Sequence, residues 1–235
     1  GQIVGGHEAQ PHSHPHMAYL KIEWIFCGSF LVAPNWVMTA AHCEGLLFFL
    51  CRAALSTCLQ KGRDAEATQQ IQGVLSYNPH SEYSSNTSSN DIVLLKARQS
   101  CSRQWATLND YVKTILLPKT DSDLPTGTKC SIAGWGPIDD DQTTSKLSET
   151  QVFIYSHRKC IRFFLHLDTG MVCAGSFHEL RDSSQSRPPA GAPTCPPLVC
   201  NKVAQGIISF GYDTPPGVYT HISEYLPWIK RTLKK

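Results

Sequence analysis

The sequence predicts an all-β fold, a barrel or a sandwich, that ends in one helix. Segments 19–24, 30–38 and 71–77 are short runs of strand-forming residues separated by turn residues, which is typical of such folds. Helical periodicity is found only between 222 and 229, where apolar residues recur at steps of three and four. No internal repeat or long linker is present in the sequence.

Composition indicates a compact protein from an oxidising compartment. The 235 residues are 41% hydrophobic, which is enough for a sizeable core. Ten cysteines and the acceptor sequon at Asn86 predict a secreted or secretory-granule glycoprotein. No apolar run is long enough to span a bilayer, and we expect a leader to have been removed before residue 1.

The net charge of +2 gives no reason to expect a nucleic-acid partner. Positive charge does gather at the C-terminus. A sulfated glycan or an anionic surface could bind there, but a solvated helix end is the simpler interpretation. The residues concerned are Lys230, Arg231, Lys234 and Lys235.

A histidine beside a cysteine is the first candidate for catalysis. Residues 31–43 read as an apolar strand that runs into a turn of small residues and presents His42 next to Cys43. Cys27 can close a short loop with Cys43 and hold this turn. A histidine fixed in this way suits a general base, although a structural histidine is the simpler alternative.

Asp91 is the candidate partner of this histidine. It is a single acid at the head of the apolar strand 92–95. A buried carboxylate is costly unless donors reach it, and the ring N–H of a catalytic histidine is one such donor. An ordinary aspartate at the start of a strand is the alternative.

His12, His14 and His16 alternate along the chain. On a strand they would share one face and form a weak metal site. A solvated loop rich in Pro and Ser explains them better, so we expect no metal and no cofactor.

Several motifs together resemble the trypsin-like serine proteases, in their granzyme and mast-cell chymase branch. They are Ile-Val-Gly-Gly at 3–6, Gly-Gly-His-Glu-Ala at 5–9, Pro-His-Ser at 11–13 and Thr-Ala-Ala-His-Cys at 39–43. The resemblance implies two packed six-stranded antiparallel β-barrels, with the site in the cleft between them. It also implies a peptidase domain over 3–235, with halves at about 3–115 and 116–235.

The resemblance implies specific roles for the N-terminus and the cysteines. Residues 1–2 look like an activation dipeptide, whose removal would free the ammonium of Ile3. By analogy the bridges are Cys27–Cys43, Cys130–Cys200 and Cys160–Cys173. The pairing of the other four cysteines stays open. These are Cys51, Cys58, Cys101 and Cys195.

The nucleophile segment departs from the family pattern. Active relatives carry Gly-Asp-Ser-Gly-Gly-Pro where this chain has Ala-Pro-Thr-Cys-Pro-Pro at 192–197. Thr194 then stands in the serine position, and its β-methyl group stiffens and crowds that side chain. Pro193 replaces the acid that pairs with the freed N-terminus. Ala192 and Pro196 replace glycines that the oxyanion hole needs.

The resemblance also implies a substrate pocket. Pro188 would lie at its floor, while Ser209, Phe210 and Gly211 match the segment that binds the substrate backbone. Gly217 would leave the pocket open to an aromatic side chain, which corresponds to chymotrypsin-like specificity.

Three interpretations follow, and we favour the first. It is an inactive homologue that binds a protein or peptide in the cleft. The second is an active granule endopeptidase in which Thr194 or a neighbouring residue is the nucleophile and His42 the base. In the third, a variant of the second, Cys195 is the nucleophile, although a disulfide is its simpler fate.

Two stretches, 44–66 and 177–196, lose the family pattern abruptly. The run 46–55 reads as either a helix or a buried strand, and 181–189 as a mobile polar loop. An altered exon joining or a shifted reading frame would also produce such a loss, in which case both stretches would fold poorly.

Overall fold

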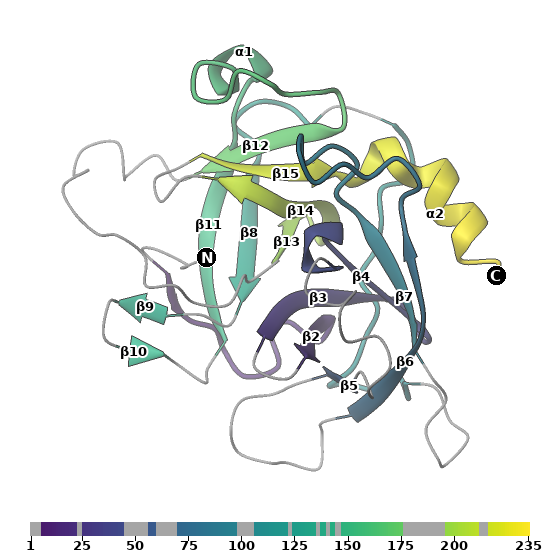
Figure 1. The fold of residues 1–235 in the computed structure, drawn as a ribbon. Helices are drawn as coiled ribbons and strands as arrows, with labels where there is room; N and C mark the ends of the chain where they lie inside the picture. Colours follow the sequence, from purple (N-terminus) through teal and green to yellow (C-terminus); the bar gives the residue numbers. More distant parts are fainter. Residues whose placement is uncertain are drawn as a thin grey trace.

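The structure is a computed structural model, and it describes residues 6–22, 25–44, 56–59, 70–97, 106–121, 124–134, 137–139, 142–143, 147–175, 196–211 and 216–235. Two β-structures lie side by side, and a C-terminal helix packs at their edge (Figure 1).

The first β-structure is a closed barrel with the strand order β2-β3-β4-β7-β6-β5. Every pair of neighbouring strands in it is antiparallel. The strands are β2 (Met17–Ile22), β3 (Ile25–Ala33), β4 (Trp36–Thr39), β5 (Ser56–Leu59), β6 (Gln70–Pro79) and β7 (Val93–Ala97).

The second β-structure is a sheet with the order β1-β11-β12-β15-β14-β13-β8. A further pairing of β11 with β8 closes six of these strands into a ring, to which β1 is added outside. The strands are β1 (His7–Glu8), β8 (Lys129–Gly134), β11 (Ser148–Ile154), β12 (Met171–Gly175), β13 (Pro197–Cys200), β14 (Val203–Gly211) and β15 (Gly217–His221).

The remaining elements are short. They are the two-stranded sheet of β9 (Pro137–Asp139) and β10 (Gln142–Thr143), the 3-10 helices η1 (Ala41–Glu44) and η3 (Ile222–Tyr225), and the α-helices α1 (His157–Cys160) and α2 (Leu226–Thr232). The fold prediction of two antiparallel barrels with a C-terminal helix is therefore confirmed.

One predicted strand was wrong in extent. Segment 30–38 is divided between β3 and β4, with a turn at Pro34 and Asn35. Proline has no N–H to give to a strand ladder, so it ends β3 and lets the chain reverse. Segments 19–24 and 71–77 fall on β2 and β6, except that 23–24 lie outside the described residues.

The stretches without a family pattern lie mostly outside the described residues. Within 44–66 the structure describes residue 44 and β5, which pairs with both β2 and β6. Within 177–196 it describes only Pro196. The run 46–55 and the polar loop 181–189 lie outside the described ranges and stay predictions. The division of the domain near residue 115 also stays a prediction.

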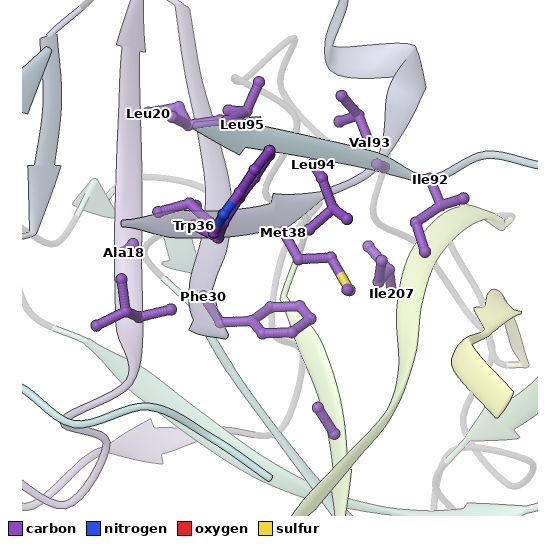
Figure 2. Close-up of a cluster of buried hydrophobic side chains, with 14 of the residues drawn as sticks. Ala18, Leu20, Phe30, Trp36, Met38, Ile92, Val93, Leu94, Leu95 and Ile207 are labelled. Atoms are coloured by element: carbon purple, nitrogen blue, oxygen red, sulfur yellow. The ribbon is translucent and has the colours of Figure 1, made fainter. Parts of the chain in front are cut away.

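The largest apolar cluster joins the two β-structures. Phe30, Met38 and Leu94 are fully buried inside the first barrel. Ile207 of β14 lies beside Met38 and belongs to the same cluster (Figure 2). The second sheet thus contributes to the core of the first barrel, which fixes how the two pack.

Three disulfides form within the described part of the chain, and they are the pairs that the resemblance implies. Cys27–Cys43 joins β3 to η1, Cys130–Cys200 joins the neighbouring strands β8 and β13, and Cys160–Cys173 joins α1 to β12. Of the other cysteines, only Cys58 lies in a described range, on β5.

The core cluster predicts a large effect of truncation at Leu94. We expect Leu94→Ala to lower the free energy of unfolding by about 2–5 kcal/mol, because a fully buried side chain leaves a cavity. Leu108→Ala is the matched control, since Leu108 is 45% exposed, and its effect should stay within about 0.5 kcal/mol. Urea denaturation measures both, and equal losses would contradict this assignment of the core.

Candidate active site

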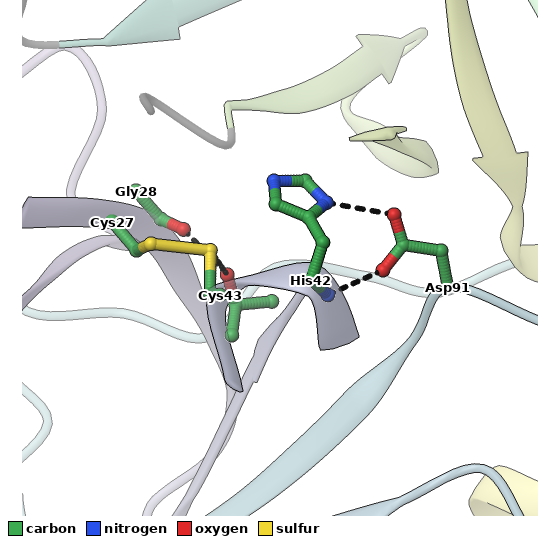
Figure 3. Close-up of a disulfide and its surroundings, with 6 residues drawn as sticks. Cys27, Gly28, His42, Cys43 and Asp91 are labelled. Carbon is green, nitrogen blue, oxygen red and sulfur yellow. Dashed lines mark hydrogen bonds and ion pairs between the residues drawn. A yellow bond between two sulfur atoms is a disulfide. The ribbon is translucent and has the colours of Figure 1, made fainter. Parts of the chain in front are cut away.

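His42 is held by the residues around it in the chain. It lies in η1, directly after Ala40 and Ala41, whose small side chains are fully buried. The bond Cys27–Cys43 ties this turn to β3, and Thr39 Oγ1 donates to the Gly28 carbonyl at 2.7 Å (Figure 3). The imidazole therefore projects from a fixed backbone, with its side chain 29% exposed.

Asp91 receives two hydrogen bonds from His42. The backbone N–H of His42 donates to Oδ1 at 2.8 Å, and the ring atom Nδ1 lies 2.7 Å from Oδ2 (Figure 3). The carboxylate is fully buried. Because an ionised carboxylate can only accept, Nδ1 carries the proton, and the lone pair of the neutral ring lies on Nε2. This is the orientation that a general base requires.

The second sheet also contacts Asp91. The hydroxyl of Ser209 on β14 donates to Asp91 Oδ2, and Thr220 Oγ1 on β15 donates to the Asp91 carbonyl at 2.9 Å. The His42–Asp91 pair thus lies where the two β-structures meet. Sequence analysis placed Ser209 in the substrate-binding wall and did not identify this bond to the acid.

The turn before Asp91 has its own support. Asn90 has a positive φ of 57°, a conformation that asparagine tolerates better than most residues. Its side chain donates to the Glu82 carbonyl at 2.9 Å and accepts from the hydroxyl of Tyr225 at 3.3 Å. Burial raises the pKa of Tyr225, so this phenol stays a donor. The carboxylate is therefore fixed by backbone and side chains alike.

Three predicted substrate residues lie on neighbouring strands. Phe210 of β14 is in register with Val218 of β15, and Gly211 pairs with Gly217. A Cβ on Gly217 would stand 3.0 Å from Ile208 Cδ1, and one on Gly211 would stand 3.2 Å from the Gly217 backbone. A Cβ at either position would thus be tightly packed, and the surface next to Gly217 is apolar.

The other predicted site residues lie outside the described ranges. These are Ile3, Pro188 and Thr194, together with the dipeptide 1–2 and Pro193. Pro196 is described: it is buried, and its carbonyl accepts a bond of 3.3 Å from Ile208 N. The structure therefore gives the base and the acid of the site but not its nucleophile.

The alternating histidines lie in a turn-rich segment before β2, as the loop interpretation predicts, but only His12 is exposed, whereas His14 and His16 are partly buried. His12 packs on the ring of Tyr111, while His14 Nε2 lies 2.5 Å from Glu149 Oε2. Across the described ranges, no group of three or more His, Cys, Asp or Glu side chains is arranged to hold a metal.

His16 is the buried member of this histidine series. Burial, with a smaller contribution from His14, lowers its pKa to about 4. Its Nε2 is buried, and no hydrogen-bond partner for it lies among the described residues. The folded protein therefore disfavours the protonated form of His16.

A histidine with a buried aspartate partner, set where two antiparallel barrels meet, defines the class of two-barrel serine proteases and their homologues. The comparisons agree with this class. The trypsin family model matches residues 3–229. The chain belongs to the trypsin family.

Within this family the similar proteins are granzyme-like and chymase-like. Mast cell protease 3 of Ovis aries is 38% identical over all of this chain and 90% of its own length. Granzyme B(G,H) of Mus musculus is 35% identical, over 100% of this chain and 92% of its own. The solved structure of GrC is 31% identical, with a TM-score of 0.82 over 99% of this chain and 100% of its own.

The burial of His16 predicts a pH-dependent stability. Its pKa is lower in the folded chain than the ordinary 6.5, so between pH 6.5 and 4 the unfolded chain binds more protons. We expect the free energy of unfolding to fall by up to about 3 kcal/mol across this interval as the pH drops. His16→Gln should flatten that dependence in denaturation curves. His166→Gln, at an exposed position, should not, and equal slopes for all three proteins would refute the prediction.

The donors around Asp91 predict that it is important for stability as well as for orientation. Asp91→Asn puts an amide group among hydroxyl and N–H donors, so we expect a loss of about 2–4 kcal/mol in the free energy of unfolding at neutral pH. Asp121→Asn, at an exposed residue, should change it by less than about 0.5 kcal/mol. Chemical denaturation distinguishes the two, and a neutral Asp91→Asn would contradict the argument.

Proposed function

We propose that this protein is a catalytically inactive homologue of the granzyme-like and chymase-like serine proteases, and that it acts by binding a protein or peptide in its cleft. The observation that carries the proposal is the sequence of residues 191–196, in which Thr194 stands where the family has its serine. The base and the acid, His42 and Asp91, are in hydrogen-bond contact without that nucleophile.

The neighbours of Thr194 oppose catalysis as well. Pro193 removes a backbone N–H, and the glycines that shape the oxyanion hole are replaced by Ala192 and Pro196. One oxyanion donor contributes about 3–4 kcal/mol to transition-state stabilisation. A threonine hydroxyl without these donors would therefore react slowly even with His42 beside it.

Activation by an N-terminal ammonium also lacks its partner. In the family, an acid next to the nucleophile receives the ammonium of the freed Ile3, but here that position is Pro193. An ammonium gains nothing from leaving water unless a counter-charge meets it. Removal of residues 1–2 is accordingly not expected to switch this protein on.

An active endopeptidase is the alternative, and one observation favours it. The Nδ1–Oδ2 distance of 2.7 Å and the added donor Ser209 form a base–acid pair that is geometrically ready for catalysis. With Thr194 as nucleophile, the apolar surroundings of Gly217 would favour chymotrypsin-like specificity.

The proposal includes a location and an additional ligand. Three disulfides and the exposed sequon residue Asn86 support a secreted or secretory-granule glycoprotein. Exposed cations at the C-terminus support binding of a sulfated glycan. They are Lys230, Arg231, Lys234 and Lys235. No helix in the described ranges combines the length and the apolar character needed to cross a membrane.

Labelling with a fluorophosphonate active-site probe tests the proposal. The folded protein is labelled before and after enzymatic removal of Gly1 and Gln2, and any adduct is located by peptide mapping. We expect no adduct in either form, because Ala192 and Pro196 replace the glycines that the oxyanion hole of the family needs.

His42→Ala is the matched control for this experiment. An adduct on Thr194 that disappears in His42→Ala would overturn the proposal and establish the active alternative. An adduct on Cys195 would instead identify a thiol nucleophile. An unlabelled protein whose cleft still binds a peptide would support the inactive homologue.

A further inference from the structure

An exposed apolar surface lies away from the candidate active site. Three large apolar side chains on the chain segment that follows α1 point into solvent: Ile161 is 40% exposed, Phe163 39% and Leu165 85%. Single exposed apolar residues are ordinary, but three within five residues form a patch. Residues 157–166, which carry this patch, are called the α1 segment below.

The backbone of the α1 segment is fixed, so this exposure does not come from a loosely held loop. Ser156 caps α1 through a bond of 3.2 Å from Lys159 N, and Phe164 N donates to the Cys160 carbonyl at 3.1 Å. The disulfide Cys160–Cys173 joins the segment to β12. These contacts set the direction of the side chains that follow.

Phe164 is a buried apolar side chain of the α1 segment. It is 7% exposed and packs edge-on against Phe210 of β14, with ring centroids 5.5 Å apart. Its neighbours Phe163 and Leu165 are exposed to solvent. The fold therefore buries one of three consecutive apolar residues and presents the other two outward.

Positive charge surrounds the apolar patch. Arg158 and Arg162 are exposed, and the ammonium of Lys159 lies 3.9 Å from the ring centroid of Tyr155. Residues 157–166 contain no Asp or Glu. The next acid along the chain, Asp168, accepts a hydrogen bond of 2.7 Å from Ser89 Oγ. The segment therefore presents exposed cations next to its apolar side chains, without an acid of its own.

The α1 segment also projects from the molecule. Figure 1 shows α1 and the chain that follows it at the outer edge, beyond β12. A flat surface could therefore approach the segment.

We propose that the α1 segment docks this protein on an anionic lipid membrane surface. Ile161, Phe163 and Leu165 would enter the boundary between headgroups and acyl chains, while Arg158 and Arg162 would contact anionic headgroups. The positive charge of the α1 segment favours an anionic partner. The exposed apolar side chains favour a lipid surface over a sulfated glycan, because a glycan has no apolar interior in which they could be buried. The docking is peripheral.

Co-sedimentation of the full chain with vesicles tests the proposal. The vesicles contain phosphatidylcholine with about one third phosphatidylserine, or phosphatidylcholine alone. We expect partition onto the anionic vesicles only. Phe163→Ser combined with Leu165→Ser should reduce it about tenfold or more, since two apolar side chains no longer insert. Arg158→Gln combined with Arg162→Gln should also reduce it about tenfold at low salt.

Two controls are matched to these variants. Leu116→Ser removes an apolar side chain that is 65% exposed elsewhere, and Arg231→Gln removes a cation from α2. Both should partition like the wild type. Thermal unfolding confirms that each variant is folded, and the arginine pair tests the segment without touching the apolar residues.

Several results would overturn the proposal. One is wild-type protein that stays in solution with anionic vesicles. Another is partition that depends on Arg231 but not on Phe163 and Leu165, which would assign binding to the basic C-terminal helix. A third result would identify a glycan as the partner. In it, the wild type binds immobilised heparin but not vesicles, and the α1-segment variants lose their retention on heparin.

Discussion

The buried carboxylate of Asp91 is the constraint on which the centre of this fold depends. A charge removed from water must be met by donors, and here the donors to the carboxylate come from both β-structures: His42 from the first and Ser209 from the second, while Thr220 of the second donates to the backbone carbonyl of Asp91. Their convergence requires β7, β14 and β15 to keep one relative position. The shared apolar cluster, to which Ile207 contributes, holds the same surfaces together.

Two local structures hold His42 and Asp91 in place. The disulfide at Cys43 and the turn at Asn90 fix the two backbones from which His42 and Asp91 project. Strands β14 and β15 are close-packed as well, because a Cβ on Gly211 or Gly217 would lie within 3.2 Å of its neighbours. The described half of the site is thus preorganised, whereas the nucleophile segment departs from the family at each position on which the chemistry depends.

The sequence predicted the parts of the molecule whose signals are local. Runs of strand-forming residues between turn residues located β2 and β6, and periodic apolar residues located the C-terminal helix. Pro34 was a local signal that the prediction of one strand over 30–38 did not use. The donor role of Ser209 could not be found this way, because its partner lies 118 residues away and the contact exists only after folding. The pairing of β1 with β11 of the second sheet is long-range in the same sense.

The donors gathered on Asp91 have an evolutionary consequence. Replacing the aspartate leaves buried N–H and hydroxyl groups without an acceptor, so the folded state itself selects for it. Under the proposed function, purifying selection for folding would then preserve the histidine–aspartate pair after peptide hydrolysis is lost. The nucleophile segment is free of that particular selection and can drift. In this fold, retention of the pair thus reflects a requirement for folding. A change of function appears first as substitutions in the segment around the serine position.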